Sequence, residues 1–236
     1  MRERQEEHIT GGGKIRSIIL GLNDGLISTF TLLVGVAAAT LTSTGNNSIV
    51  LLTGFAAMVS GAISMGLGEY ISSKSEYNYI KNELKKEKAE IELFPEEEKE
   101  EVRDIFEKMG MKGQTLDACV ESITSNKQVW IDFLTKSELG LEEPENPILG
   151  ALLTFLSFVF GSFLTLFAYI FNLGMVSLIL SSVISFSMLF IVGALKTKIT
   201  GEHKIKSSLE MVTIGIVAFI ASYAIGTLLE QLIATA

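Results

Sequence analysis

The chain has 236 residues, 48% of them apolar, and a mean hydropathy of +0.41, which is high for a soluble protein. Its net charge of −8 excludes an overall basic surface for nucleic acid, and its single cysteine excludes an intrachain disulfide or a multi-cysteine metal site. The apolar residues are concentrated in the segments 17–41, 48–72 and 148–233, so we predict an all-α, polytopic membrane protein with the lipid bilayer as its environment.

The first two apolar segments have the length of single membrane spans. The N-terminal tail, 1–16, is polar and lacks an apolar core, so we expect the first span to direct insertion without a signal peptide. A bilayer core about 30 Å thick requires about 20 helical residues, and 17–41 and 48–72 each meet that length. Residues 17–73 are therefore predicted to hold transmembrane helices 1 and 2.

The segment 74–147 carries most of the charge and has the pattern of a small helical domain. Residues 74–92 are rich in helix formers without Gly or Pro, so the second helix should continue well beyond the membrane. Pro95 suits the first position of a helix over 95–109, and later helices are expected from Thr115 and over 128–139. The sequence thus predicts an acidic helical insert between spans 2 and 3.

The last apolar segment has room for three spans. The triplet Asn172-Leu173-Gly174 offers a tight reversal, and the stretch from Lys196 to Lys206 is a polar break. We therefore predict spans over 148–171, 174–195 and 208–232, which makes 148–236 the region of transmembrane helices 3–5.

Positive charge is confined to alternate connections. All nineteen Lys and Arg residues lie in the N-terminal tail, the 74–147 insert and the 196–206 loop, and none lies in 42–47, in 172–174 or after Glu230. By the positive-inside rule, the N-terminus and the insert are cytoplasmic and the C-terminus is on the opposite side. The insert nevertheless holds 19 acidic against 11 basic residues, so the cytoplasmic side also attracts cations.

Two residues within the spans are candidates for an ion pathway. Asp24 lies about 12 Å into the first span and Met65 about 13 Å into the second, counted from the cytoplasmic side. An acid in hydrocarbon is a functional hypothesis by default, and a carboxylate with a thioether suits Fe²⁺ better than Mg²⁺ or Ca²⁺. The alternatives are a structural hydrogen bond for Asp24 and simple packing for Met65. Glu69, one turn nearer the cytoplasm, either passes ions onward or lies among the headgroups.

Two pairs of glutamates share helix faces in the insert. Glu87 and Glu90 are spaced i, i+3 on the extended second helix, and Glu98 and Glu101 repeat the spacing on the next helix. If these helices pack together, four carboxylates meet, which is how hard divalent cations bind through oxygen. An ordinary solvated charged face explains the same spacing.

Three motifs give the chain a family resemblance. They are Asn23-Asp24-Gly25-Leu26, the run SGAISMGLGEY from Ser60 to Tyr70, and Glu138-Leu139-Gly140-Leu141. With the five spans and the insert, they make the chain similar to the vacuolar iron transporter family over nearly its whole length. The resemblance implies a homodimeric, proton-coupled exporter of cytosolic Fe²⁺, in some relatives Mn²⁺, located in the vacuolar membrane of a eukaryote or the plasma membrane of a prokaryote.

The resemblance also implies roles for individual residues. Asp24 and Met65 match the pore residues, and the glutamates of the cytoplasmic metal-binding domain are matched by Glu87, Glu90, Glu98, Glu101 and Glu138. Two positions depart from the pattern. Ala57 replaces a second pore acid, which bears on proton coupling, and Leu134 replaces a methionine, which leaves an oxygen-based site less selective for Fe²⁺ over Mn²⁺, Zn²⁺ or Co²⁺.

We therefore expect a transporter and not an enzyme, with Fe²⁺ as substrate and no tightly bound cofactor. Two copies are expected to meet through their first spans, where small residues permit close contact, namely Gly21, Gly25, Gly35 and Ala39. The main alternative is a membrane metal sensor without transport activity. A di-iron oxidase is disfavoured because the only histidines, His8 and His203, lie outside the insert.

Overall fold

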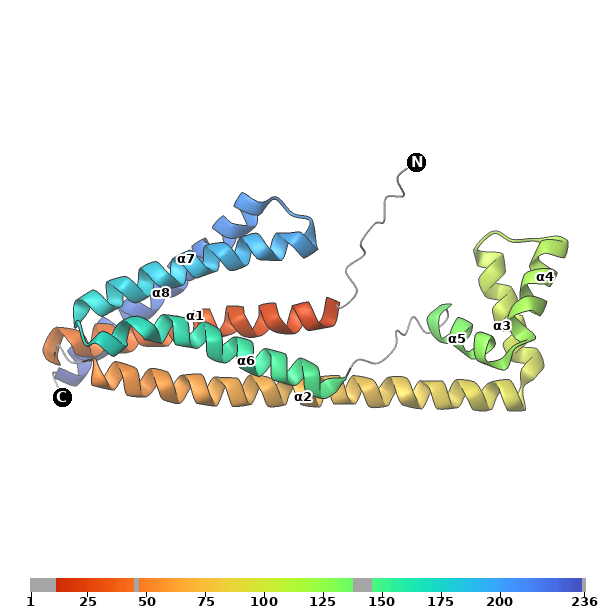
Figure 1. Ribbon diagram of the computed structural model, residues 1–236, viewed down its shortest axis with the longest axis horizontal. Helices are drawn as coiled ribbons and strands as arrows, with labels where there is room; N and C mark the ends of the chain where they lie inside the picture. The colour runs from red at the N-terminus through yellow and green to blue at the C-terminus, as the bar shows by residue number, and fades with distance from the viewer. Residues whose placement is uncertain (1–11, 45–46, 138–145, 235–236) are drawn as a thin grey trace. The chain divides into compact units, whose positions relative to one another are not determined.

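The computed structural model describes residues 12–44, 47–137 and 146–234. Every element in these ranges is helical, as predicted. In chain order the elements are α1 (Gly12–Thr44), α2 (Ser48–Leu93), α3 (Pro95–Lys108), α4 (Gly113–Thr124), α5 (Lys127–Ser137), α6 (Pro147–Leu166), the 3₁₀ helix η1 (Phe167–Phe171), α7 (Met175–Thr200) and α8 (Lys204–Ala234) (Figure 1).

The chain divides into two compact units. The membrane unit consists of Met1–Ile71 and Pro147–Ala236, and the inserted unit consists of Ser72–Asn146. The inserted unit covers nearly the residues that the sequence assigns to a cytoplasmic domain. Its location in the cytoplasm and its binding of metal stay predictions.

Five helices are long and apolar enough to cross a membrane, which confirms the predicted number of spans: α1, α2, α6 with η1, α7 and α8. The helix of the second span continues without a break for 46 residues. At 1.5 Å per residue α2 is about 69 Å long, more than twice the thickness of a bilayer core. Length alone therefore takes α2 well beyond one side of the membrane.

The connections among the last three spans agree in part with expectation. The reversal at Asn172 and Gly174 is present, and both residues have positive φ, which lets the chain turn tightly between η1 and α7. The polar break is shorter than predicted. Because lysine favours helix and its charge can reach past apolar surface, α7 continues to Thr200, where Gly201 ends it, and α8 begins at Lys204.

Helix α1 is the central helix of the membrane unit and packs against α6, α7 and α8 (Figure 1). A Cβ added at Gly21 or Gly25 would collide with backbone carbonyl oxygens of α6, and one added at Gly35 would lie 2.8 Å from the Oγ of Ser222 on α8. These glycines therefore serve contacts within one chain. Because α6 and α8 already cover Gly21, Gly25 and Gly35, these three positions are not open to a second copy, and a contact between two copies through α1 stays a prediction.

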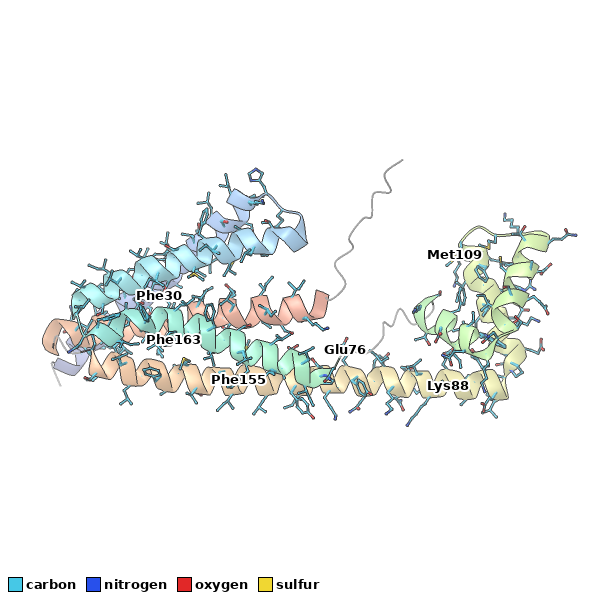
Figure 2. The ribbon with its side chains drawn as sticks, in the orientation of Figure 1. Phe30, Glu76, Lys88, Met109, Phe155 and Phe163 are labelled. Atoms are coloured by element: carbon cyan, nitrogen blue, oxygen red, sulfur yellow. The ribbon has the colours of Figure 1, made fainter. Side chains whose placement is uncertain are left out.

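Helix α2 is covered much less than α1. Within their most apolar windows 28% of α2 is buried, against 50% of α1. Helix α2 contacts α6 through glycines that face aromatic rings: Gly61 faces Phe158, and Gly66 faces Phe155, which Figure 2 shows at α6 on the side of α2. Helix α2 thus contacts side chains of α6, whereas α1 contacts the backbone of α6 directly.

The inserted unit has its own apolar core. The end of α2 and helices α3, α4 and α5 contribute buried side chains, namely Ile91, Val102, Phe106, Leu116, Val120, Trp130, Ile131 and Leu134. Cys119 packs against this core, as expected of a small packing residue. On the surface Arg103 pairs with Asp117 at 2.8 Å, joining α3 to α4, and Lys127 pairs with Glu92, joining α5 to α2.

Candidate functional site

Asp24 lies near the middle of α1 and is half-buried. Its neighbours one turn away on the same face, Leu20 and Ser28, are exposed, and so is Leu32 beyond them. Gly21 and Gly25 occupy the adjacent face, which α6 covers closely. The carboxylate therefore belongs to the uncovered face of α1, inside a helix that is apolar enough to cross a membrane.

Glu69 lies where three helices of the membrane unit meet. The Oγ of Ser17 on α1 donates a hydrogen bond of 3.1 Å to Oε1 of Glu69 on α2, and a Cβ added at Gly150 of α6 would lie 3.3 Å from the same oxygen. Ser17 is 4% exposed and Glu69 is half-buried, so this bond is partly shielded from the surroundings. Sequence reasoning found Glu69 but missed Ser17, because a serine at a span end has no distinctive spacing.

Met65 is half-buried on α2, one turn from Glu69. The bond between Ser17 and Glu69 fixes the register of α1 against α2. Asp24 is seven residues beyond Ser17, about 10 Å, and Met65 is four residues from Glu69, about 6 Å. Met65 is thus nearly one turn nearer the Glu69 end than Asp24, a stagger that the equal depths expected from sequence did not include.

The four described glutamates of the predicted metal-binding domain divide into two kinds. Glu87 and Glu98 are only 4% and 6% exposed, whereas Glu90 and Glu101 are exposed. Although the two glutamates of each pair are spaced i, i+3, one is therefore buried and the other is exposed to solvent. Each buried carboxylate precedes a core residue by four positions, Glu87 before Ile91 and Glu98 before Val102.

Those two core residues belong to one cluster, so Glu87 on α2 and Glu98 on α3 lie on helix faces that turn toward the same core. Glu98 is also in the first turn of α3, where the helix dipole favours negative charge. Among the described residues, no three His, Cys, Asp or Glu side chains come together closely enough to hold a metal ion. Glu138, the fifth predicted ligand, lies outside the described residues.

The two positions that depart from the family pattern have different environments. Leu134 is fully buried in the core of the inserted unit, and Ala57 is half-buried on α2. A methionine side chain at position 134 would therefore lie in the core of the inserted unit and not on its surface. His203 is exposed, as expected, and His8 lies outside the described residues.

Five membrane-crossing helices with a carboxylate inside the central one define an integral membrane protein of the multi-pass helical class. The family model described as VIT family matches residues 15–227. This match spans all five apolar helices and the inserted unit, so the chain belongs to the VIT family.

Curated relatives agree with that assignment. "Vacuolar iron transporter 1" of Arabidopsis thaliana is 36% identical over 229 residues, which cover 96% of this chain and 90% of the relative. "Vacuolar iron transporter 1" of Tulipa gesneriana is 34% identical over 234 residues, 98% of this chain and 93% of the relative. A more distant relative, the "Vacuolar iron transporter" of Toxoplasma gondii, is 31% identical and covers 98% of this chain.

Proposed function

We propose that the protein moves divalent metal ions, Fe²⁺ first and Mn²⁺ second, out of the cytoplasm in exchange for protons. The observation that carries this proposal is Asp24, an acid on the uncovered face of the central membrane helix, in a chain whose relatives are named vacuolar iron transporters. A carboxylate at this depth is costly to keep, so its presence supports a functional role such as ion passage.

The proposed direction follows from charge. The N-terminus and the inserted unit then lie in the cytoplasm, and the C-terminus lies on the opposite side. The acidic inserted unit attracts cations in the cytoplasm, which is the side from which they are exported. Glu69 then receives the ion and passes it to Met65 and Asp24, which lie successively deeper. In a eukaryote the opposite compartment is the vacuole, and in a prokaryote it is the exterior.

We further propose that two copies form the pathway together. Asp24 lies on the face of α1 next to the one that α6 covers, so a path along it needs a second wall. Helix α2 offers a contact for another copy, because small exposed residues recur at every fourth position: Ala56, Ser60, Ser64 and Gly68. A Cβ added at Gly68 meets no atom within 4 Å, so this stripe is open.

The direct test is ion flux into proteoliposomes. Fe²⁺, Mn²⁺, Co²⁺ and Zn²⁺ uptake would be measured with and without a pH gradient for the wild type and for Asp24→Ala. The control is Glu210→Gln, which removes an exposed acid near the start of α8. We expect the pH gradient to drive Fe²⁺ uptake, Asp24→Ala to abolish it, and the control to retain it.

Two results would overturn the proposal. Unchanged uptake by Asp24→Ala would remove this residue from the pathway. Tight metal binding by the wild type without flux of any of the four ions would favour the metal sensor instead.

A further inference from the structure

Positive charge is concentrated at the connection between α7 and α8. Residues 196–206 hold four lysines and a single acid, Glu202. We call three of these lysines the basic end of the α7–α8 pair: Lys196, Lys204 and Lys206. The connection lies at the same end of the membrane unit as the start of α1 (Figure 1). The basic end therefore lies at one boundary of the membrane-crossing helices.

The two helices meet backbone to backbone beside this connection. A Cβ added at Gly193 of α7 would lie 2.6 Å from Cα of Ser208 and 2.9 Å from the carbonyl oxygen of Ser207 on α8. Lys196 follows Gly193 by three residues, which is about one turn. Lys204 precedes Ser208 by four residues, which is again about one turn. The close packing thus fixes the two points from which these lysines extend and keeps their like charges near each other.

The single acid does not neutralise the basic end. Oε2 of Glu202 lies 4.0 Å from Nζ of Lys196, at the limit of an ion pair, and the Glu202 side chain is half exposed. Lys204 and Lys206 are exposed, and neither forms an ion pair within the described part of the chain. Positive charges held together with too little acid attract an anion from the surroundings.

Exposed apolar side chains lie among the lysines and indicate that these surroundings are lipid. Ile205, between Lys204 and Lys206, is 59% exposed, and Leu209, one turn further along α8, is 54% exposed. The apolar span of α8 begins at this same turn. In a membrane these side chains contact acyl chains, and the lysines beside them extend to the depth of the headgroup phosphates.

We propose that the basic end of the α7–α8 pair binds the phosphate group of an anionic phospholipid, whose acyl chains lie along Ile205 and Leu209. Basic pockets between membrane helices bind such headgroups. The proposed orientation places this end in the cytoplasmic leaflet, where anionic lipids are concentrated. Lysines that served only to orient the chain during insertion would need neither the fixed pairing across two helices nor an exposed isoleucine between them.

The test is native mass spectrometry of the full-length protein in detergent, titrated with phosphatidylglycerol or with phosphatidylcholine of the same acyl chains. The lysine variant combines Lys204→Gln with Lys206→Gln. The matched control combines Lys14→Gln with Arg16→Gln, which removes two exposed positive charges from the start of α1 at the same end of the membrane unit. A third variant, Ile205→Gln, removes the apolar contact and keeps every lysine.

We expect the wild type to bind phosphatidylglycerol more tightly than phosphatidylcholine. Loss of one lysine at a membrane surface weakens the attraction of an anionic lipid about fivefold, so the lysine variant should bind phosphatidylglycerol about thirtyfold more weakly. The α1 control should stay near the wild-type affinity. Ile205→Gln should weaken the binding of both lipids, because it acts on the acyl chains. Lys204→Arg combined with Lys206→Arg, which keeps both charges, should bind like the wild type.

Three results would overturn the inference. Equal affinity of the wild type for the two lipids would show that the headgroup is not recognised. Equal losses in the lysine variant and the α1 control would reduce the effect to a general attraction by positive charge. Displacement of phosphatidylglycerol by inorganic phosphate, with Ile205→Gln unaffected, would make the basic end a site for a soluble anion. None of these measurements involves ion flux, so their outcome is independent of the proposed transport.

Discussion

The glutamates of the inserted unit show how much a single turn of helix matters at the scale of a residue. Glu87 and Glu90 are three positions apart, yet the first is buried beside the core and the second is exposed. A buried charge is screened less by water and salt than an exposed one, so its interaction with a cation is stronger. We therefore expect the buried acids Glu87 and Glu98 to dominate metal binding.

This expectation gives a prediction for metal affinity. Glu87→Gln and Glu98→Gln should each weaken Mn²⁺ or Fe²⁺ binding to the full-length protein by about tenfold or more, the scale typical of a disturbed metal shell. Glu90→Gln and Glu101→Gln should have smaller effects. Titration calorimetry in detergent would measure all four, and equal losses at buried and exposed positions would contradict the prediction.

Leu134 provides a second prediction at this scale. Because its side chain fills the core of the inserted unit, Leu134→Met should be tolerated, with a cost below about 1.5 kcal/mol, whereas Leu134→Ala should cost about 2–5 kcal/mol. Thermal unfolding of the detergent-solubilised protein would separate the two. An Ala variant as stable as the Met variant would show that the core adapts to the lost volume.

At the scale of elements, glycines decide which helices pack against each other. Gly25 sits against a backbone carbonyl of α6, whereas Gly68 on α2 faces open space. Gly25→Ala should therefore reduce the yield and thermal stability of the folded protein, and Gly68→Leu should leave the single chain folded but separate two copies. Mass measurement in detergent checks the second effect. A Gly68→Leu protein that remains dimeric would exclude the α2 contact.

The ion pair between Lys127 and Glu92 joins two elements of the inserted unit and should give them a pH-dependent attachment. The hydrogen bond from Lys127 holds the pKa of the Glu92 carboxyl below its usual value. A lowered pKa in the folded state stabilises the fold above the unfolded pKa, and the effect is lost as the pH falls through the folded value.

Hydrogen exchange at the start of α5 would measure this attachment. Glu92→Gln should exchange faster than the wild type at pH 7, and the difference should disappear in acid as the wild-type carboxyl becomes protonated. Lys86, whose pair with Glu83 lies within α2, offers the control variant Lys86→Met, which should not alter exchange in α5. A difference for Glu92→Gln that persists unchanged in acid would count against the ion pair.

At the scale of the whole molecule, sequence predicts the elements better than their contacts. The five spans follow from uninterrupted apolar length, and the continuous α2 follows from helix formers between Lys74 and Glu92. The covered face of α1 could not be predicted, because glycines that permit contact with another copy also permit contact with α6. Burial of Glu87 could not be predicted either, because its spacing is the same on a core face and on a solvated one.

The row of buried serines on α7 was within reach of the sequence but was not recognised. Ser177, Ser181 and Ser185 recur at every fourth position of an apolar helix, which places them on one face. Only the packing of α6 shows that this face is covered and that its hydroxyl groups meet those of another helix.

The backbone contact between α1 and α6 has a mechanical consequence. With no layer of side chains between Gly25 and Phe158, neither helix can slide without breaking the contact, so the two form one rigid body. Helix α2 instead borders a groove of about 340 Å³ beside Phe155 and Leu152 of α6. If the pathway opens alternately to its two sides, we expect α2 to move, while α1 with Asp24 stays in place against α6.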